Sequence, residues 1–144
     1  MVEDTIGSPT SITLTTQDQY YPWISVSSSH ADTPYVSFVA DSTNGDYLLV
    51  GSEGAGHYKA EFHVSFSGSA SQTYVATLFL DAGATHASIA RGIGTAGDVG
   101  AASGSALIEV ADGQKLRLKF KCSTAGSKAV GIHVCHVMMR RVGR

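Results

Sequence analysis

The chain has 144 residues and a formal net charge of −2, and 43% of its residues are hydrophobic while only 15% are charged. This length predicts one domain with its own hydrophobic core, and the low charge excludes a disordered protein. The sequence has no basic run before the C-terminus and no apolar run near the ~20 residues that span a bilayer. We therefore expect neither nucleic-acid binding nor membrane insertion, and no cofactor.

The N-terminal part divides into an arm and a first strand. Residues 1–10 are polar and end in a Gly-Ser-Pro run, which predicts a flexible arm ahead of a single domain at 11–144. Apolar and hydroxyl residues alternate over 11–16, and this predicts a short strand. The acidic first residues lack the pattern of a signal peptide, so we expect a protein made and kept in a cytosol or released by lysis.

The clearest strand of the chain runs from Gly56 to Gly68. Its apolar and polar residues alternate with a period of two, which places the apolar set on one face of a sheet and the polar set on the other. The apolar set is Tyr58, Ala60, Phe62, Val64 and Phe66. Shorter strands are predicted at 35–39 and 47–50, separated by an Asn-Gly turn.

The second half of the chain continues as strands and turns. The run 74–80 is apolar on both faces, and 83–104 is a Gly-, Ala- and Thr-rich region with one weak strand near 88–93 and a long loop after it. Further strands are predicted at 105–110, 115–122 and 130–139, the first two joined by an Asp-Gly turn. A basic tail ends the chain at 140–144.

These elements predict an all-β fold. Turns rich in Gly, Asn, Asp and Ser separate about eight to ten strands, and no segment carries a helical apolar stripe. The natural class is an antiparallel two-sheet sandwich, and this strand count favours a jelly roll.

Two strands have more apolar surface than a sandwich of two sheets explains. The runs 74–80 and 130–139 are apolar on both faces, although such a sandwich buries only one face of each strand. Either loops of the same chain cover the second face, or a second subunit covers it, and we favour a subunit interface.

Three motifs resemble the tumour-necrosis-factor and complement globular-head superfamily. They are the Gly-His-Tyr-Lys-Ala-Glu-Phe run at 56–62, the apolar strand that ends in Asp81-Ala82-Gly83, and the Gly-Ser-Ala-Leu-Ile-Glu-Val-Ala-Asp-Gly-Gln-Lys-Leu run at 104–116. The resemblance covers roughly 45–137 and implies a jelly-roll fold and a compact three-fold trimer. Because the chain has no collagen repeat and no extracellular signal, it is more similar to jelly-roll modules of bacteriophage virions.

Two groups of side chains are expected to make contacts. The expected trimer interface is formed by apolar side chains of the strand at 56–68 and of the two strands that are apolar on both faces, 74–80 and 130–139. These are Tyr58, Phe62, Tyr74, Leu78, Phe79, Val134, Val137 and Met139. A partner or ligand is expected to contact the aromatic side chains of the 17–29 segment and two arginines of the tail. These are Tyr20, Tyr21, Trp23, Arg140 and Arg141.

Metal and catalytic sites are not expected. His133 and His136 should fall on opposite faces of their strand because their separation is odd, and no pair of histidines has ligand spacing. A histidine contributed by three subunits at a three-fold axis is the exception. Cys122 and Cys135 are expected to be small buried residues, although a bridge between them remains open.

The resemblance implies a non-enzymatic role in a virion. The expected protein is a homotrimer that decorates and stabilises a capsid, docking on the major capsid protein or another virion protein through several weak sites at once. It would be made in the host cytoplasm. A receptor-binding or fibre tip and an adhesion module for a host-surface glycan are the alternatives, and a hydrolase ranks after them.

Overall fold

The computed structural model describes residues 2–24, 29–30 and 32–144, which form strands and the turns that connect them. Side chains are described for residues 11–24 and 32–144. None of these residues forms a helix able to cross a membrane. The strands are β1 (Val2–Leu14), β2 (Tyr21–Pro22), β3 (Ser29–His30), β4 (Val36–Val39), β5 (Tyr47–Val50), β6 (Gly56–Ser67), β7 (Gln72–Leu80), β8 (Gly83–Ile93), β9 (Val99–Val110), β10 (Lys115–Cys122) and β11 (Lys128–Gly143).

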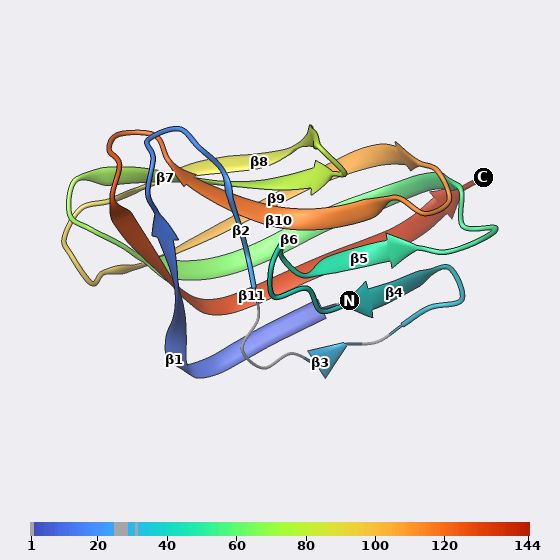
Figure 1. The fold of residues 1–144 in the computed structure, drawn as a ribbon, viewed down its shortest axis with the longest axis horizontal. Coiled ribbons are helices and arrows are strands. Elements are labelled where there is room, and N and C mark those ends of the chain that lie inside the picture. Colours follow the sequence, from blue (N-terminus) through green and yellow to red (C-terminus); the bar gives the residue numbers. More distant parts are fainter. Residues whose placement is uncertain (1, 25–28, 31) are drawn as a thin grey trace.

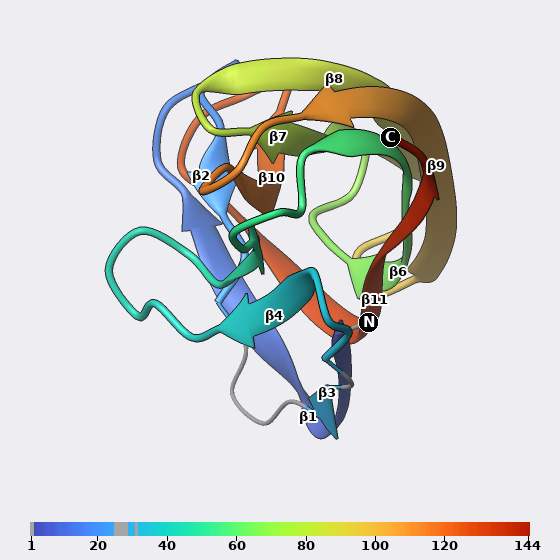
Figure 2. The ribbon, with the colours of Figure 1, turned by 90° about the vertical axis from the view of Figure 1, so that its right-hand side faces the viewer.

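The strands form two sheets packed face to face, as the sequence predicts (Figure 1). Sheet I has the order β3-β1-β11-β6-β9, and sheet II has the order β4-β5-β10-β7-β8 with β2 paired to β10. All pairings are antiparallel. The end-on view of Figure 2 shows β8 and β9 meeting along one side of the sandwich. The antiparallel jelly-roll sandwich is therefore confirmed.

The core lies between the sheets and follows the period of two. In β6 the five apolar side chains predicted to face inward are all 3% exposed or less. In β10 the residues Leu116, Leu118, Phe120 and Cys122 are buried, while the cations between them are half-buried on the outer side. Cys122 and Cys135 are both buried and unbridged. The prediction that they are small buried residues is confirmed.

Both ends of the chain are more regular than the sequence suggests. The strand β1 begins at Val2, and within the stretch where a flexible arm is expected residues 2–5 and 10 pair with β11 and residues 2–3 pair with β3. Its register shifts between Thr5 and Thr10, a stretch that includes the Gly-Ser-Pro run. At the other end β11 continues to Gly143, so most of the expected basic tail is strand.

The Gly-rich region is also strand and not loop. The structure has β8 over Gly83–Ile93 and β9 from Val99, so the predicted long loop shrinks to the turn between them. The prediction failed because glycine and alanine give no period-two signal. Gly104 shows why a small residue is needed here: a Cβ at this position would lie 2.7 Å from the Phe62 ring.

The outer face of β7 is covered by the same chain. Tyr20 packs edge-on against Phe79 with ring centroids 4.8 Å apart, and its hydroxyl lies 3.0 Å from Thr77 Oγ1. Phe79 is consequently only 8% exposed. The strand at 74–80 is apolar on both faces because a segment of the same chain covers its outer face, which is the first of the two explanations considered for this strand.

Candidate functional site

Most of the side chains expected at a trimer interface lie inside one chain. Seven of the eight are at most 8% exposed, namely Tyr58, Phe62, Tyr74, Leu78, Phe79, Val137 and Met139. All except Phe79 belong to the core between the sheets. These seven side chains have no surface to offer a neighbour, and this corrects the expectation for them. Val134 differs because it lies on the outer side of sheet I, where it is half-buried.

The outer face of sheet I is the candidate surface. It is formed by the side chains of β11, β6 and β9 that alternate with the core residues, and residues paired across the three strands define its rows. From one end to the other the rows are Arg140–Lys59–Leu107, Met138–Glu61–Ser105, His136–His63–Ser103 and Val134–Ser65–Ala101.

A β-bulge in β11 changes which histidines share this face. The register of β11 against β6 shifts between Ile132 and Val134, so one extra residue, His133, is inserted. His133 Nε2 lies 3.0 Å from the Oγ of outward-facing Ser67, and His136 pairs with outward-facing His63. Both histidines therefore lie on the outer face. The prediction that they fall on opposite faces is wrong, because the bulge breaks the alternation.

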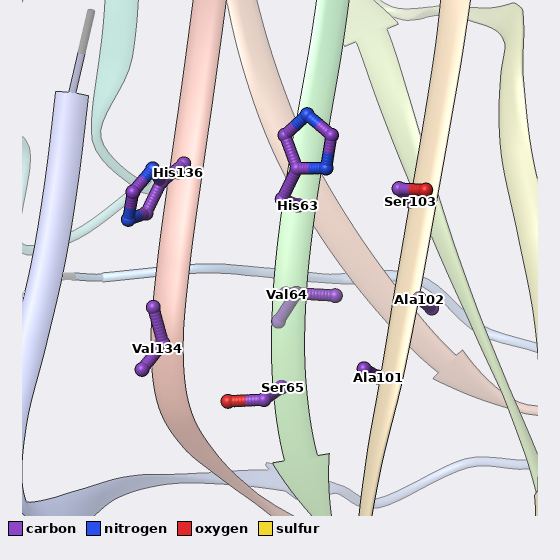
Figure 3. Close-up of a pocket in the computed structure, with 8 residues that line it drawn as sticks. All are labelled: His63, Val64, Ser65, Ala101, Ala102, Ser103, Val134 and His136. Carbon is purple, nitrogen blue, oxygen red and sulfur yellow. The ribbon is translucent and has the colours of Figure 1, made fainter.

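A hollow occupies the middle of the outer face of sheet I. Its volume is about 600 Å³, and small, uncharged and imidazole side chains line most of it (Figure 3). The rows of His136 and Val134 line it, together with Val64 and Ala102. In the figure, Ser103 and Ala101 of β9 lie beside His63 and Ser65 of β6. The hollow is open and shallow, which suits a packing partner better than an enclosed small molecule.

The far end of the same face is charged. Lys59 Nζ lies 2.8 Å from Glu61 Oε2. The hydrogen bond from Lys59 holds the pKa of the Glu61 carboxyl below its ordinary value, and the charges of Lys59, His63 and Arg140 act in the same direction. Leu107 stands next to this group with 74% of its surface exposed. The outer face thus carries both signs of charge beside an exposed apolar side chain.

The aromatic residues expected to bind a ligand do not form a binding platform. Trp23 is 2% exposed and belongs to the core. Tyr20 packs on Phe79 and has Lys121 over its ring at 5.0 Å, and the Tyr21 hydroxyl accepts a hydrogen bond from the Thr16 amide at 2.9 Å. These contacts tie the segment to its own chain, so these three side chains do not together form an open surface for a partner or ligand.

The two arginines expected to meet a partner have different environments. Arg140 is exposed on the outer face of sheet I, opposite Lys59. The guanidinium of Arg141 lies 4.6 Å from the Tyr35 ring centre and donates hydrogen bonds to the carbonyl oxygens of Glu53 and Ala55. Arg140 is available to a partner, whereas Arg141 closes one end of the sandwich.

The cations of β10 form a further group of contacts, one that the spacing of residues in the sequence does not indicate. Lys115 and Arg117 lie over the Tyr47 ring, and Lys119 lies 4.6 Å from the Phe79 ring centre. Burial lowers the pKa of Lys119, and the nearby charge of Arg117 lowers it further. Arg117 and Lys121 each pair with an aspartate. This row therefore holds sheet II and its covering segment together.

The chemistry available on the outer face of sheet I is that of imidazoles and a hydroxyl. Ser67 and His133 are hydrogen-bonded, but a nucleophilic serine also needs an acid to orient its histidine. Among the side chains that the structure describes, no carboxylate bonds to His133. Nor do three or more potential metal ligands gather anywhere in the described parts of the chain.

Comparisons with known proteins bear on the fold alone. No protein-family model matches the chain, and no curated protein matches it. Among solved structures, the Eiger TNF of S. frugiperda superposes with a TM-score of 0.61, covering 99% of this chain and 93% of that one at 12% identity. The chain therefore has a tumour-necrosis-factor-like jelly-roll fold, and at this identity the similarity says nothing of its activity.

Sequence reasoning missed the pairing of His63 with His136. The two residues lie far apart in the chain and become neighbours only through the register of β6 with β11. Spacing within one strand carries no such signal. The period of two does predict that His63 faces outward, and a correct register for the last strand would have revealed its partner.

Proposed function

We propose that the chain is a self-associating structural module whose copies meet through the outer face of sheet I to form a three-fold trimer. One observation carries the proposal: the two sheets differ in how their outer faces are covered. Tyr20 and its neighbours lie over sheet II, whereas the hollow of sheet I has no cover among the residues that the structure describes.

The outer face of sheet I suits a second copy of the same chain. Its central rows are built from small residues such as Ser65, Ala101 and Ser103, so another surface can approach the strands closely. Its charged end carries Lys59, Glu61 and Arg140 together, so a symmetric contact has both signs available for pairing. Val134 and Leu107 supply apolar area at either end.

The role we propose for the trimer is that of a non-enzymatic virion component, a decoration protein that stabilises a bacteriophage capsid. The proposal is supported by the jelly-roll fold and by the resemblance of the sequence to modules of phage virions. Three identical copies present three identical docking surfaces, so weak contacts with the major capsid protein add up to firm attachment.

The trimer is tested by light scattering coupled to size-exclusion chromatography. The chain has a mass of 15.0 kDa, so a trimer has a mass three times larger, about 45 kDa. Ala101→Glu buries three carboxylates in the proposed contact and should give the single-chain mass. Ala84→Glu, at an exposed alanine of β8 that does not line this hollow, is the matched control and should leave the mass unchanged.

The virion role needs a separate test. Purified protein should bind expanded, empty capsids of the phage that encodes it and raise their resistance to heat or denaturant. The Ala101→Glu variant should bind far more weakly, because it loses multivalency. A wild-type trimer that does not bind any capsid would reject decoration while leaving the trimer intact. A wild-type protein of single-chain mass would reject the trimer itself.

A further inference from the structure

Four cations follow one another along the outer side of β10, the central strand of sheet II (Figure 1). They are Lys115, Arg117, Lys119 and Lys121. Every second residue of a strand lies about 7 Å from the next, so the row is about 20 Å long. All four residues are half-buried, so solvent still reaches them. Because the chain has a net charge of −2, the row concentrates positive charge against the average of the protein.

The carboxylates beside this row balance only part of its charge. Among the side chains that the structure describes, two carboxylates lie within ion-pair distance of the four cations. Asp41 Oδ2 lies 3.6 Å from Arg117 Nη2, and Asp18 Oδ1 lies 3.5 Å from Lys121 Nζ. Both distances are longer than a direct hydrogen bond between charged groups. The other two cations lie over aromatic rings, which attract a cation without neutralising it. A surplus of positive charge therefore remains.

Lys119 lies at the centre of this surplus. Its Nζ is 4.6 Å from the Phe79 ring centre, and no described carboxylate pairs with it. Burial lowers the pKa of Lys119, and the charge of Arg117 lowers it further, so the amine is close enough to feel a second cation. At the end of the row the surplus is smaller, because the Asp81 carboxylate accepts a hydrogen bond from the backbone amide of Lys115.

We propose that Lys119 and Arg117 bind a phosphate or sulfate group. Such a group has several oxygens that accept charge-assisted hydrogen bonds, so it can contact an ammonium and a guanidinium at the same time. Its negative charge compensates the surplus of the row. Lys115 and Lys121 extend the positive strip on either side, so a polymer that carries several such groups gains further contacts. The site lies on sheet II and goes beyond the trimer proposed for sheet I.

Isothermal calorimetry of the full chain with sodium phosphate at low ionic strength tests the site. The wild type should bind saturably, and Lys119→Gln should weaken binding by about 10- to 100-fold, because a hydrogen bond to a charged group is lost. Lys119→Arg keeps the charge and should retain most of the affinity. Lys128→Gln removes a lysine at the start of β11 in sheet I and should change nothing.

Two further measurements refine this test. Sulfate stabilises folded proteins in general, but it should raise the midpoint of thermal unfolding of the wild type more than that of Lys119→Gln. If Lys119→Gln does not fold by circular dichroism, Lys119→Met keeps the apolar stem over Phe79 and takes its place. Heparin, a sulfated polysaccharide, distinguishes the source of the group. Binding through Lys119 that is tighter for heparin than for phosphate identifies a polymer, and equal binding identifies a free ion.

Four outcomes would overturn the anion site. They are the absence of saturable phosphate binding by the wild type, unchanged binding by the Lys119 variants, an equal loss in Lys128→Gln, and equal rises of the midpoint in sulfate for wild type and variant. Light scattering of the same samples separates the site from the trimer. A protein of single-chain mass that binds phosphate through Lys119 rejects only the trimer, and a trimer that does not bind phosphate rejects only the anion site.

Discussion

At the scale of single residues, burial decides what a side chain contributes. Leu78 and Leu107 are the same amino acid on two long strands, yet the first is fully buried and the second is 74% exposed. Leu78 fills space between the sheets, where neighbouring atoms surround it on all sides. Leu107 touches water at the end of the outer face of sheet I. The two leucines therefore report on different properties of the protein.

Replacing Leu78 with alanine should cost stability and not assembly. The expected loss is about 2–5 kcal/mol in the free energy of unfolding, because the transfer energy of the side chain and the cavity left behind add together. Val142→Ala, at a side chain that is 51% exposed, is the control and should cost about 0.5 kcal/mol or less. Urea titration followed by tryptophan fluorescence measures both. A Leu78→Ala protein of normal stability but reduced molar mass would show instead that Leu78 lies at a subunit interface.

At the scale of elements, the sequence predicts those strands whose alternation is strict. The strand at β6 and the hairpin of β9 and β10 follow from alternating side chains and an Asp-Gly turn. The strand β8 and the first half of β9 do not, because glycine and alanine fit either face of a sheet. What selects small residues there is tertiary: Gly104 accommodates the Phe62 ring, and that contact exists only after β6 and β9 pair.

The candidate site shows the same division between local and tertiary information. Alternation alone predicts that His63 and Ser65 face away from the core. It fails for His133, because a single inserted residue in β11 shifts every later side chain by one step. No local pattern announces that bulge. The apolar residues on both faces of the strand at 74–80 likewise predict that its outer face is covered, but only the folded chain shows that Tyr20 covers it.

The turn between β9 and β10 gives a prediction about an element. Gly113 has a φ of +81°, and a Cβ added there meets nothing within 4 Å, so the effect of a side chain is purely conformational. Gly113→Ala should lower the free energy of unfolding by about 1–2 kcal/mol. Gly113→Asn should lose less, because asparagine tolerates this conformation.

Gly92 provides the matched control for that prediction. It also has nothing within 4 Å of an added Cβ, but its φ lies outside the left-handed region. Gly92→Ala should therefore change the free energy of unfolding by about 0.5 kcal/mol or less. Denaturant titrations of the three variants decide the matter. Equal losses in Gly92→Ala and Gly113→Ala would show that the turn conformation is not what limits the hairpin.

At the scale of the whole molecule, the two outer faces of the sandwich are unequal. Tyr20 and cations stacked on aromatic rings hold a segment of the same chain over the outer face of sheet II. The outer face of sheet I presents a hollow, an exposed leucine and a charged end. If copies of the chain bury that hollow, their folding and their association become one equilibrium.

Thermal stability should therefore depend on protein concentration. Association stabilises the folded state by mass action, so the midpoint of thermal unfolding should rise across a roughly hundredfold increase in concentration. Ala101→Glu should unfold at a lower midpoint that no longer moves with concentration, because the carboxylate prevents the hollow from being buried. Ala84→Glu should keep the wild-type dependence. Differential scanning calorimetry at several concentrations measures all three proteins, and a wild-type midpoint that stays fixed would mean that one chain is stable alone and that the hollow in sheet I serves another partner.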